Sequence, residues 1–110
     1  MNSKSQKDIL EKLFTVLEDR KNNPSDHSYV TSLYRDGNNK INEKILEEAR
    51  EYIEAIKSNK KGSIVHEAAD LWFHTFVSLA LNDLTANDIL EELERRFGQS
   101  GIEEKASREK

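Results

Sequence analysis

The sequence contains no cysteine. Disulfide bonds, thiolate metal ligands and a cysteine nucleophile are therefore excluded within it. Proline occurs once and glycine four times among 110 residues, which leaves few points at which a helix has to end. Because the chain is also rich in Glu, Lys, Leu and Ala, this scarcity predicts an all-α fold.

Long apolar runs and an excess of positive charge are lacking as well. No apolar stretch approaches the roughly 20 residues of a membrane span, and the N-terminus has no signal-peptide core, so we expect a cytoplasmic location without membrane contact. The formal net charge is −4 and the pI is near 5.4, which argues against nucleic-acid binding. An anionic ligand would need a local basic patch or a metal ion to offset the acidic residues.

The apolar fraction is small for a globular chain. Apolar and charged residues each make up 35%, against about 45–50% and 25% in average domains. We expect a single domain over residues 1–110, with a core over about 5–98 and a charged tail over 99–110. Because so polar a chain has a thin core, we also expect a homodimer in which a second copy covers apolar surface.

Apolar residues recur at helical spacing in four segments, at about residues 5–20, 42–59, 64–81 and 84–97. Residues 28–34 are expected to add a short helix, although several of them are strand formers, and residues 35–39 a turn. Asn42 and Ser63 are expected to cap the two central helices. The third segment is apolar almost all round, which predicts the most buried helix. The expected fold is a bundle of four to five helices around a hairpin of residues 42–59 and 64–81.

Two acidic pairs lie on the two helices of this expected hairpin. Glu48 and Glu51 are three residues apart, and so are Glu67 and Asp70, so each pair shares one helix face. Glu47 precedes the first pair. Because consecutive antiparallel helices lie side by side, the two pairs can meet and form a set of hard oxygen ligands, which suits Mg²⁺ or Mn²⁺.

The alternative is that these residues form a solvated acidic face, which is the usual role of glutamates on a helix surface. The second pair argues for a site, because Asp70 directly precedes Leu71, Trp72 and Phe73. A carboxylate next to so apolar a segment needs a buried partner or a cation. Composition and spacing alone leave both interpretations open.

A family resemblance is carried by these residues and their surroundings. The pattern Glu47-Glu48-x-x-Glu51, then fifteen intervening residues, then Glu67-x-x-Asp70, resembles the signature of the all-α nucleotide pyrophosphohydrolases, the MazG-like superfamily. Within it, residues 28–33, 44–49, 65–74 and 100–108 resemble the phosphoribosyl-ATP pyrophosphatases of histidine biosynthesis. The likeness covers residues 9–108. Trp72 and Phe73 depart from it, because a smaller apolar residue and a tyrosine are common there.

The resemblance implies hydrolysis of 1-(5-phosphoribosyl)-ATP to 1-(5-phosphoribosyl)-AMP and pyrophosphate. It implies that Glu48, Glu51, Glu67 and Asp70 hold Mg²⁺, with Mn²⁺ as a substitute, and that Glu47 orients or deprotonates the attacking water. Many relatives are fused to the cyclohydrolase that acts next, whereas this sequence carries only the one domain. The resemblance therefore implies a separate phosphoribosyl-AMP cyclohydrolase as a pathway partner. Cations expected to hold the substrate are Lys44, Arg96, Lys105 and Arg108.

Other interpretations remain beside this one. Lys44 and Arg96 are also placed to form ordinary surface ion pairs, and His74 is expected to be a hydrogen-bonded core histidine. A house-cleaning hydrolase of non-canonical nucleoside triphosphates would use the same acidic residues. A module that docks a partner helix through Phe76 and Leu79 would need no metal.

Overall fold

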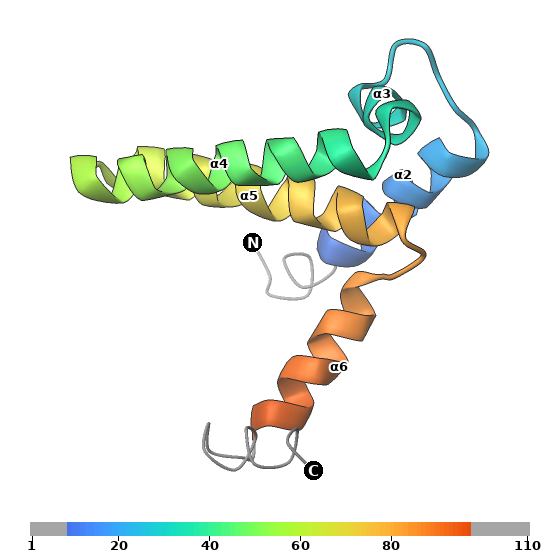
Figure 1. Cartoon of the computed structure of the whole chain (residues 1–110). Coiled ribbons are helices and arrows are strands. Elements are labelled where there is room, and N and C mark those ends of the chain that lie inside the picture. Colours follow the sequence, from blue (N-terminus) through green and yellow to red (C-terminus); the bar gives the residue numbers. More distant parts are fainter. Residues whose placement is uncertain (1–8, 98–110) are drawn as a thin grey trace.

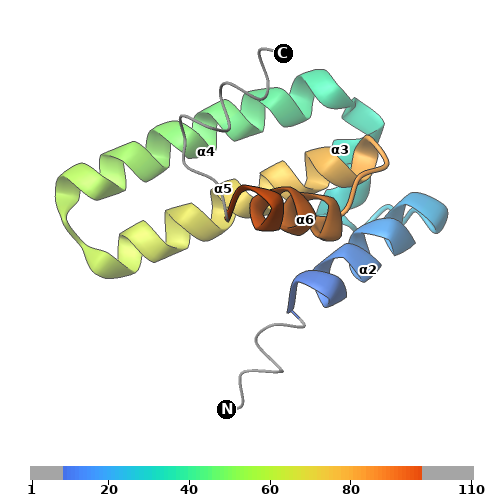
Figure 2. The same ribbon diagram turned by 90° about the horizontal axis from the view of Figure 1, so that it is seen from below.

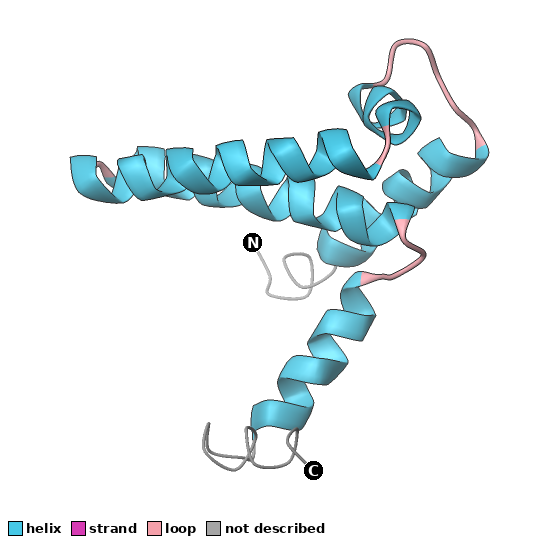
Figure 3. Cartoon of the chain, in the orientation of Figure 1, coloured by secondary structure: helices cyan, strands magenta, loops and turns pink. Residues whose placement is uncertain are grey.

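The computed structural model describes residues 9–97, and within that range the chain is helical without a strand, as predicted (Figures 1 and 3). The helices are α2 (Ile9–Asn22), α3 (Tyr29–Asp36), α4 (Asn38–Ser58), α5 (Lys61–Leu81) and α6 (Ala86–Phe97). Helices α4 and α5 form the expected central hairpin. They run antiparallel and side by side over their whole length (Figures 1 and 2). None of the helices in the described range is long and apolar enough to cross a membrane.

The core lies at the end of the hairpin where α2 and α3 pack against it. Leu17, Ile41 and Val77 are fully buried there, and each contributes roughly 1.5–3 kcal/mol through removal of its side chain from water. Phe14 of α2 packs against Phe76 of α5, with ring centroids 5.4 Å apart. The buried apolar cluster consists of Phe14, Leu17, Val30, Leu33, Ile41, Val77, Ala80 and Ala86.

The short helix α3 forms in spite of its strand-forming residues. Ser28 caps it, because its side-chain oxygen accepts a hydrogen bond from the backbone N–H of Thr31 at 3.2 Å. The helix then buries Val30 and Leu33 in the core. Capping and burial therefore outweigh the local strand preference.

The turn predicted over residues 35–39 is present but shorter than predicted, and the predicted cap at Asn42 is wrong. Helix α3 continues to Asp36 and α4 begins at Asn38, so Gly37 alone joins them. Gly37 has φ 86°, a conformation that glycine adopts without steric cost. The earlier start of α4 also places Ile41 in the core, where it is fully buried.

The turn at the tip of the hairpin also differs from the prediction. Asn59 ends α4 in the left-handed conformation, with φ 58°, because asparagine tolerates this region better than most residues. Lys60 is the N-cap of α5 and makes no side-chain capping bond, so the predicted cap at Ser63 is wrong. Gly62 lies within the first turn of α5, and α4 ends without a glycine.

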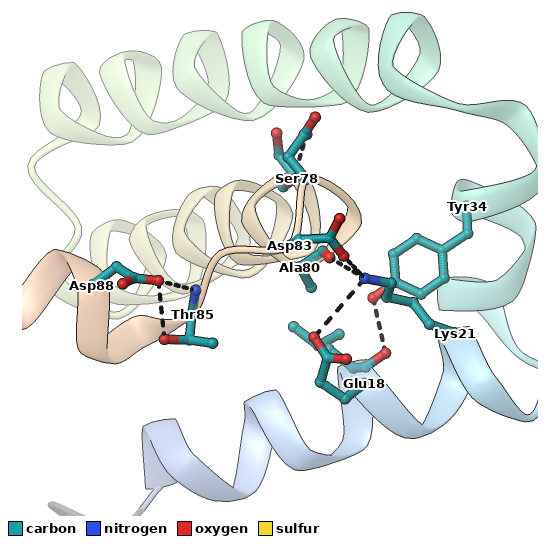
Figure 4. Close-up of polar contacts among 10 residues, drawn as sticks. Glu18, Lys21, Tyr34, Ser78, Ala80, Asp83, Thr85 and Asp88 are labelled. Carbon is teal, nitrogen blue, oxygen red and sulfur yellow. Dashed lines mark hydrogen bonds and ion pairs between the residues drawn. The ribbon is translucent and has the colours of Figure 1, made fainter.

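Polar contacts attach α2 to the C-terminal end of α5 (Figure 4). Lys21 Nζ donates to the carbonyl oxygen of Ala80 at 2.8 Å and to the carboxylate of Asp83 at 2.6 Å. At the start of helix α6 the Asp88 carboxylate accepts hydrogen bonds from both the N–H and the hydroxyl of Thr85. The predicted start of α6 at residue 84 or 85 is confirmed to within one or two residues.

Helix α5 is buried less completely than predicted. His74, Val77 and Ala80 are buried in its C-terminal half, whereas Trp72 is 60% exposed. Trp72 belongs to an apolar groove of about 480 Å³ between α2, α5 and α6. We call this surface the apolar groove; it is lined by Leu10, Leu71, Trp72, Thr75, Phe76, Ala86, Ile89, Leu90 and Leu93.

Candidate metal centre

The hairpin brings the two acidic pairs together. One carboxylate oxygen from each of Glu48, Glu51 and Glu67 lies within 4.8 Å of the other two. Glu67 also belongs to a second group, in which its carboxylate and that of Asp70 lie within the same distance of an imidazole nitrogen of His66. The four predicted metal ligands therefore fall into two adjoining groups, which span α4 and α5 and share Glu67. We call these four residues the carboxylate cluster.

Two oxygen atoms of this cluster are buried without a hydrogen-bond partner. They are Oε2 of Glu48 and Oε2 of Glu67. Glu48 as a whole is only 6% exposed. A buried carboxylate oxygen without a donor costs free energy, and a bound cation removes that cost. The donor set consists of hard oxygens, which are the ligands that Mg²⁺ and Mn²⁺ prefer. The residues present therefore fit a divalent cation of this kind.

The electrostatics of the cluster point the same way. Burial, followed by the neighbouring carboxylates of Glu51 and Asp70, raises the pKa of Glu48 to about 7. Burial and Glu51 also raise the pKa of Glu67. Both shifts arise because negative charges are held close together and partly away from water. A divalent cation between them would reverse this repulsion.

Glu47 and Lys44 lie together at the edge of the cluster. Lys44 Nζ lies 3.2 Å from Oε2 of Glu47 and 3.9 Å from Oε1 of Glu48. The hydrogen bond to Glu47 is the main reason that the pKa of Lys44 is raised. The Glu47 side chain is about half exposed, so it is open to water while its neighbour Glu48 is buried.

The structure reveals two contacts to Asp70 that sequence reasoning missed. His66 Nε2 lies 3.3 Å from Oδ2 of Asp70, and the four-residue spacing of this pair was a readable signal. His74 is buried, as predicted, with Nδ1 2.8 Å from the backbone oxygen of Asp70. Its Nε2 contacts the hydroxyl of Tyr29 at 2.8 Å, a pairing across 45 residues that no local pattern indicates.

Of the other predicted substrate-binding cations, only Arg96 lies in the described part of the chain, and it is not among the residues of this cluster. Arg96 lies in the last turn of α6 and pairs with Glu92 at 3.0 Å. Helix α6 runs away from the hairpin (Figure 1), so the single chain does not bring Arg96 to the carboxylates. Lys105 and Arg108 lie outside the described residues.

Comparison with known proteins gives a consistent result. Residues 10–97 match the family described as phosphoribosyl-ATP pyrophosphohydrolase. The phosphoribosyl-ATP pyrophosphatase of Methylococcus capsulatus is 52% identical, and that of Ruthia magnifica is 50% identical. Each alignment covers 92% of this chain and 96% of the relative.

A longer relative, the histidine biosynthesis bifunctional protein HisIE of Helicobacter hepaticus, is 48% identical over 91% of this chain and 43% of its own length. The family match includes both helices of the hairpin and the complete carboxylate cluster. The chain belongs to the phosphoribosyl-ATP pyrophosphohydrolase family.

Proposed function

We propose that the chain hydrolyses 1-(5-phosphoribosyl)-ATP to 1-(5-phosphoribosyl)-AMP and pyrophosphate, an early step of histidine biosynthesis. The observation that carries the proposal is the carboxylate cluster with its two unpartnered buried oxygens, in a chain about half identical to phosphoribosyl-ATP pyrophosphatases. The product is then the substrate of a phosphoribosyl-AMP cyclohydrolase.

The chemistry needs an ion, a water molecule and a base. Glu48, Glu51, Glu67 and Asp70 would hold Mg²⁺, and the ion would neutralise negative charge on the phosphates of the substrate. Glu47 is exposed beside them, so it orients the attacking water and accepts its proton. The water oxygen bonds to a phosphorus of the α–β phosphoanhydride, whose bridging bond breaks, and pyrophosphate leaves. Lys44 keeps Glu47 at the edge of the cluster and offers a positive charge to a phosphate.

The substrate also requires contacts that the carboxylates cannot supply. We assign Arg96, Lys105 and Arg108 to this task. Arg96 lies on a helix that leaves its own hairpin, so we infer that it serves a site completed by a second copy of the chain.

We propose that this second copy is present in a homodimer. The apolar groove contains Trp72 at 60%, Leu90 at 48% and Leu93 at 55% exposure. A contiguous apolar surface of this kind marks an association site. Its lining comes from helices α2, α5 and α6, and an identical copy offers the same apolar side chains in return, as a two-fold interface requires.

The proposal is tested by incubating the purified chain with phosphoribosyl-ATP and with a panel of nucleoside triphosphates, with and without Mg²⁺. We expect pyrophosphate release from phosphoribosyl-ATP only when the metal is present. Preferential hydrolysis of non-canonical nucleoside triphosphates would support the house-cleaning alternative. Absence of any metal-dependent release would reject the enzyme and favour a docking module.

A further inference from the structure

A second polar depression lies next to the carboxylate cluster, at the tip of the hairpin. It has a volume of about 430 Å³ and is open to solvent. We call it the tip pocket; the residues that line it without belonging to the cluster are Arg50, Glu54, Ala55, Ser58, Lys60 and Ser63. Glu51 and Glu67 line it as well, so the pocket and the cluster share two side chains.

Arg50 is the most informative residue of the tip pocket. It makes no hydrogen bond or ion pair with any residue between 9 and 97, although Glu47 and Glu54 lie three residues before it and four residues after it on α4. By contrast, the neighbouring Lys57 pairs with Glu54 at 3.4 Å. Arginine presents five donors in a planar fork that matches phosphate oxygens. An unengaged guanidinium at the rim of a predicted metal centre is therefore available to an anionic ligand.

The start of α5 adds donors to the same pocket. Lys60 is the N-cap, and no side chain caps the first turn of the helix. The first intrahelical bond closes at the N–H of Ile64, which donates to the carbonyl oxygen of Lys60. The preceding backbone N–H groups therefore lack helical acceptors, and the positive end of the helix dipole favours an anion there.

The pocket carries two cations, Arg50 and Lys60, beside the carboxylates of Glu51, Glu54 and Glu67. It therefore suits a phosphate that arrives together with a metal ion, and it does not suit a nucleobase. Its only apolar side chain is Ala55, and it contains no aromatic ring. The opposite end of the cluster is different. Beyond Asp70 the next turn of α5 carries Phe73, whose ring stacks on Tyr29 at 6.4 Å. In a ligand that carries phosphates at one end and a base at the other, the phosphates therefore match the polar tip pocket. The base matches the aromatic side chains at the opposite end of the cluster.

We propose that the tip pocket binds the two terminal phosphates of the substrate, which leave as pyrophosphate, and that Arg50 is their principal donor. The inference rests on the proposed function. Because Glu51 and Glu67 belong to both sites, phosphates in the tip pocket lie against the ion that these carboxylates hold. The α-phosphate, on the other side of the scissile bond, then lies along the cluster toward Lys44.

The test measures binding of inorganic pyrophosphate to the full chain by calorimetry in the presence of Mg²⁺. Arg50→Gln is expected to weaken pyrophosphate binding about tenfold, and Arg50→Lys to restore part of it. Arg35→Gln is the matched control, since Arg35 lies on α3 and pairs with Asp26 at 3.0 Å. It is expected to bind pyrophosphate as the unchanged chain does. Thermal melting confirms that every variant is folded.

A second ligand, 1-(5-phosphoribosyl)-AMP, lacks the two terminal phosphates and therefore tests which phosphates the tip pocket binds. Binding of 1-(5-phosphoribosyl)-AMP is expected to be unaffected by Arg50→Gln. If that binding falls and pyrophosphate binding does not, the pocket holds the sugar phosphate and the inference is wrong. It is also wrong if the unchanged chain binds no pyrophosphate. Failure of the proposed function has a separate signature, namely the absence of Mg²⁺-dependent pyrophosphate release from phosphoribosyl-ATP.

Discussion

The hydroxyl of Tyr29 lies 2.8 Å from Nε2 of His74, and Nδ1 of the same ring lies 2.8 Å from the backbone oxygen of Asp70. A carbonyl oxygen only accepts hydrogen bonds, so Nδ1 donates to Asp70, and Nε2 lies at hydrogen-bond distance from the hydroxyl. Burial raises the pKa of Tyr29, which keeps that hydroxyl protonated. Helix α3 is thereby connected to the turn of α5 that carries a predicted metal ligand.

The first prediction concerns this connection. Tyr29→Phe removes the hydroxyl, so we expect it to weaken Mg²⁺ binding several-fold and to reduce turnover about tenfold. Tyr34→Phe is the control, because it removes a similar bond, from the hydroxyl of Tyr34 to the backbone oxygen of Leu17 at 3.0 Å, away from the cluster. Each variant should lose roughly 1 kcal/mol of stability. Equal Mg²⁺ affinities in the two variants would show that Tyr29 has only a structural role.

The second prediction concerns the ligands. Glu51→Gln and Asp70→Asn each replace a charged oxygen with an amide, so we expect turnover to fall at least about a hundredfold while the helical circular dichroism signal is retained. Glu43→Gln, an exposed glutamate on α4 whose nearest cation is 3.9 Å away, should leave activity unchanged. Normal turnover in either ligand variant contradicts the assignment.

The third prediction concerns pH in the metal-free chain. The pKa of Glu48 is about 7 in the folded protein, against an ordinary 4.5. Between these values the folded state holds the proton more tightly than the unfolded state, so stability falls as pH rises through this window. We expect the melting temperature to drop by several degrees from pH 5 to pH 8.

Two controls accompany that measurement. Saturating Mg²⁺ should remove the decrease, because the cation compensates the ionised carboxylates. Glu48→Gln should have a flatter profile than the unchanged chain over the same pH range. If the two metal-free profiles are parallel, Glu48 is not the titrating group.

The fourth prediction concerns the apolar groove. Leu90→Lys places a charge on a surface that the proposed homodimer covers, and Leu90 is already 48% exposed in the single chain. We therefore expect the variant to remain helical but to shift from a dimeric to a monomeric mass in light scattering. Glu91→Lys, next to it on α6, is the control. A monomeric mass for the unchanged chain would reject the dimer.

Local patterns predicted the helices and the acidic pairs, because both depend on spacing within about one or two turns. The turns were harder to predict. The single-residue link at Gly37 depends on burial of Ile41 against other helices. At the other end of α4, Asn59 takes the left-handed conformation, although Gly62, three residues later, belongs to the residue type that adopts it most readily. The Tyr29–His74 contact and the tip pocket arise from packing, which no single segment encodes. The sequence alone does not indicate a binding role for Arg50, because a lone arginine among glutamates is typical of a solvated helix face.

The tight turn at Asn59 and Lys60 also has a kinetic consequence. It places Glu48 and Glu67 only nineteen positions apart in the sequence, so closing the loop between them costs little chain entropy. Contacts between residues this close in sequence form early in folding, before α2 and α6 pack against the hairpin. We therefore expect the hairpin to belong to the folding nucleus, so that destabilising substitutions at its interface slow refolding, whereas those at the α2–α6 contact mainly accelerate unfolding.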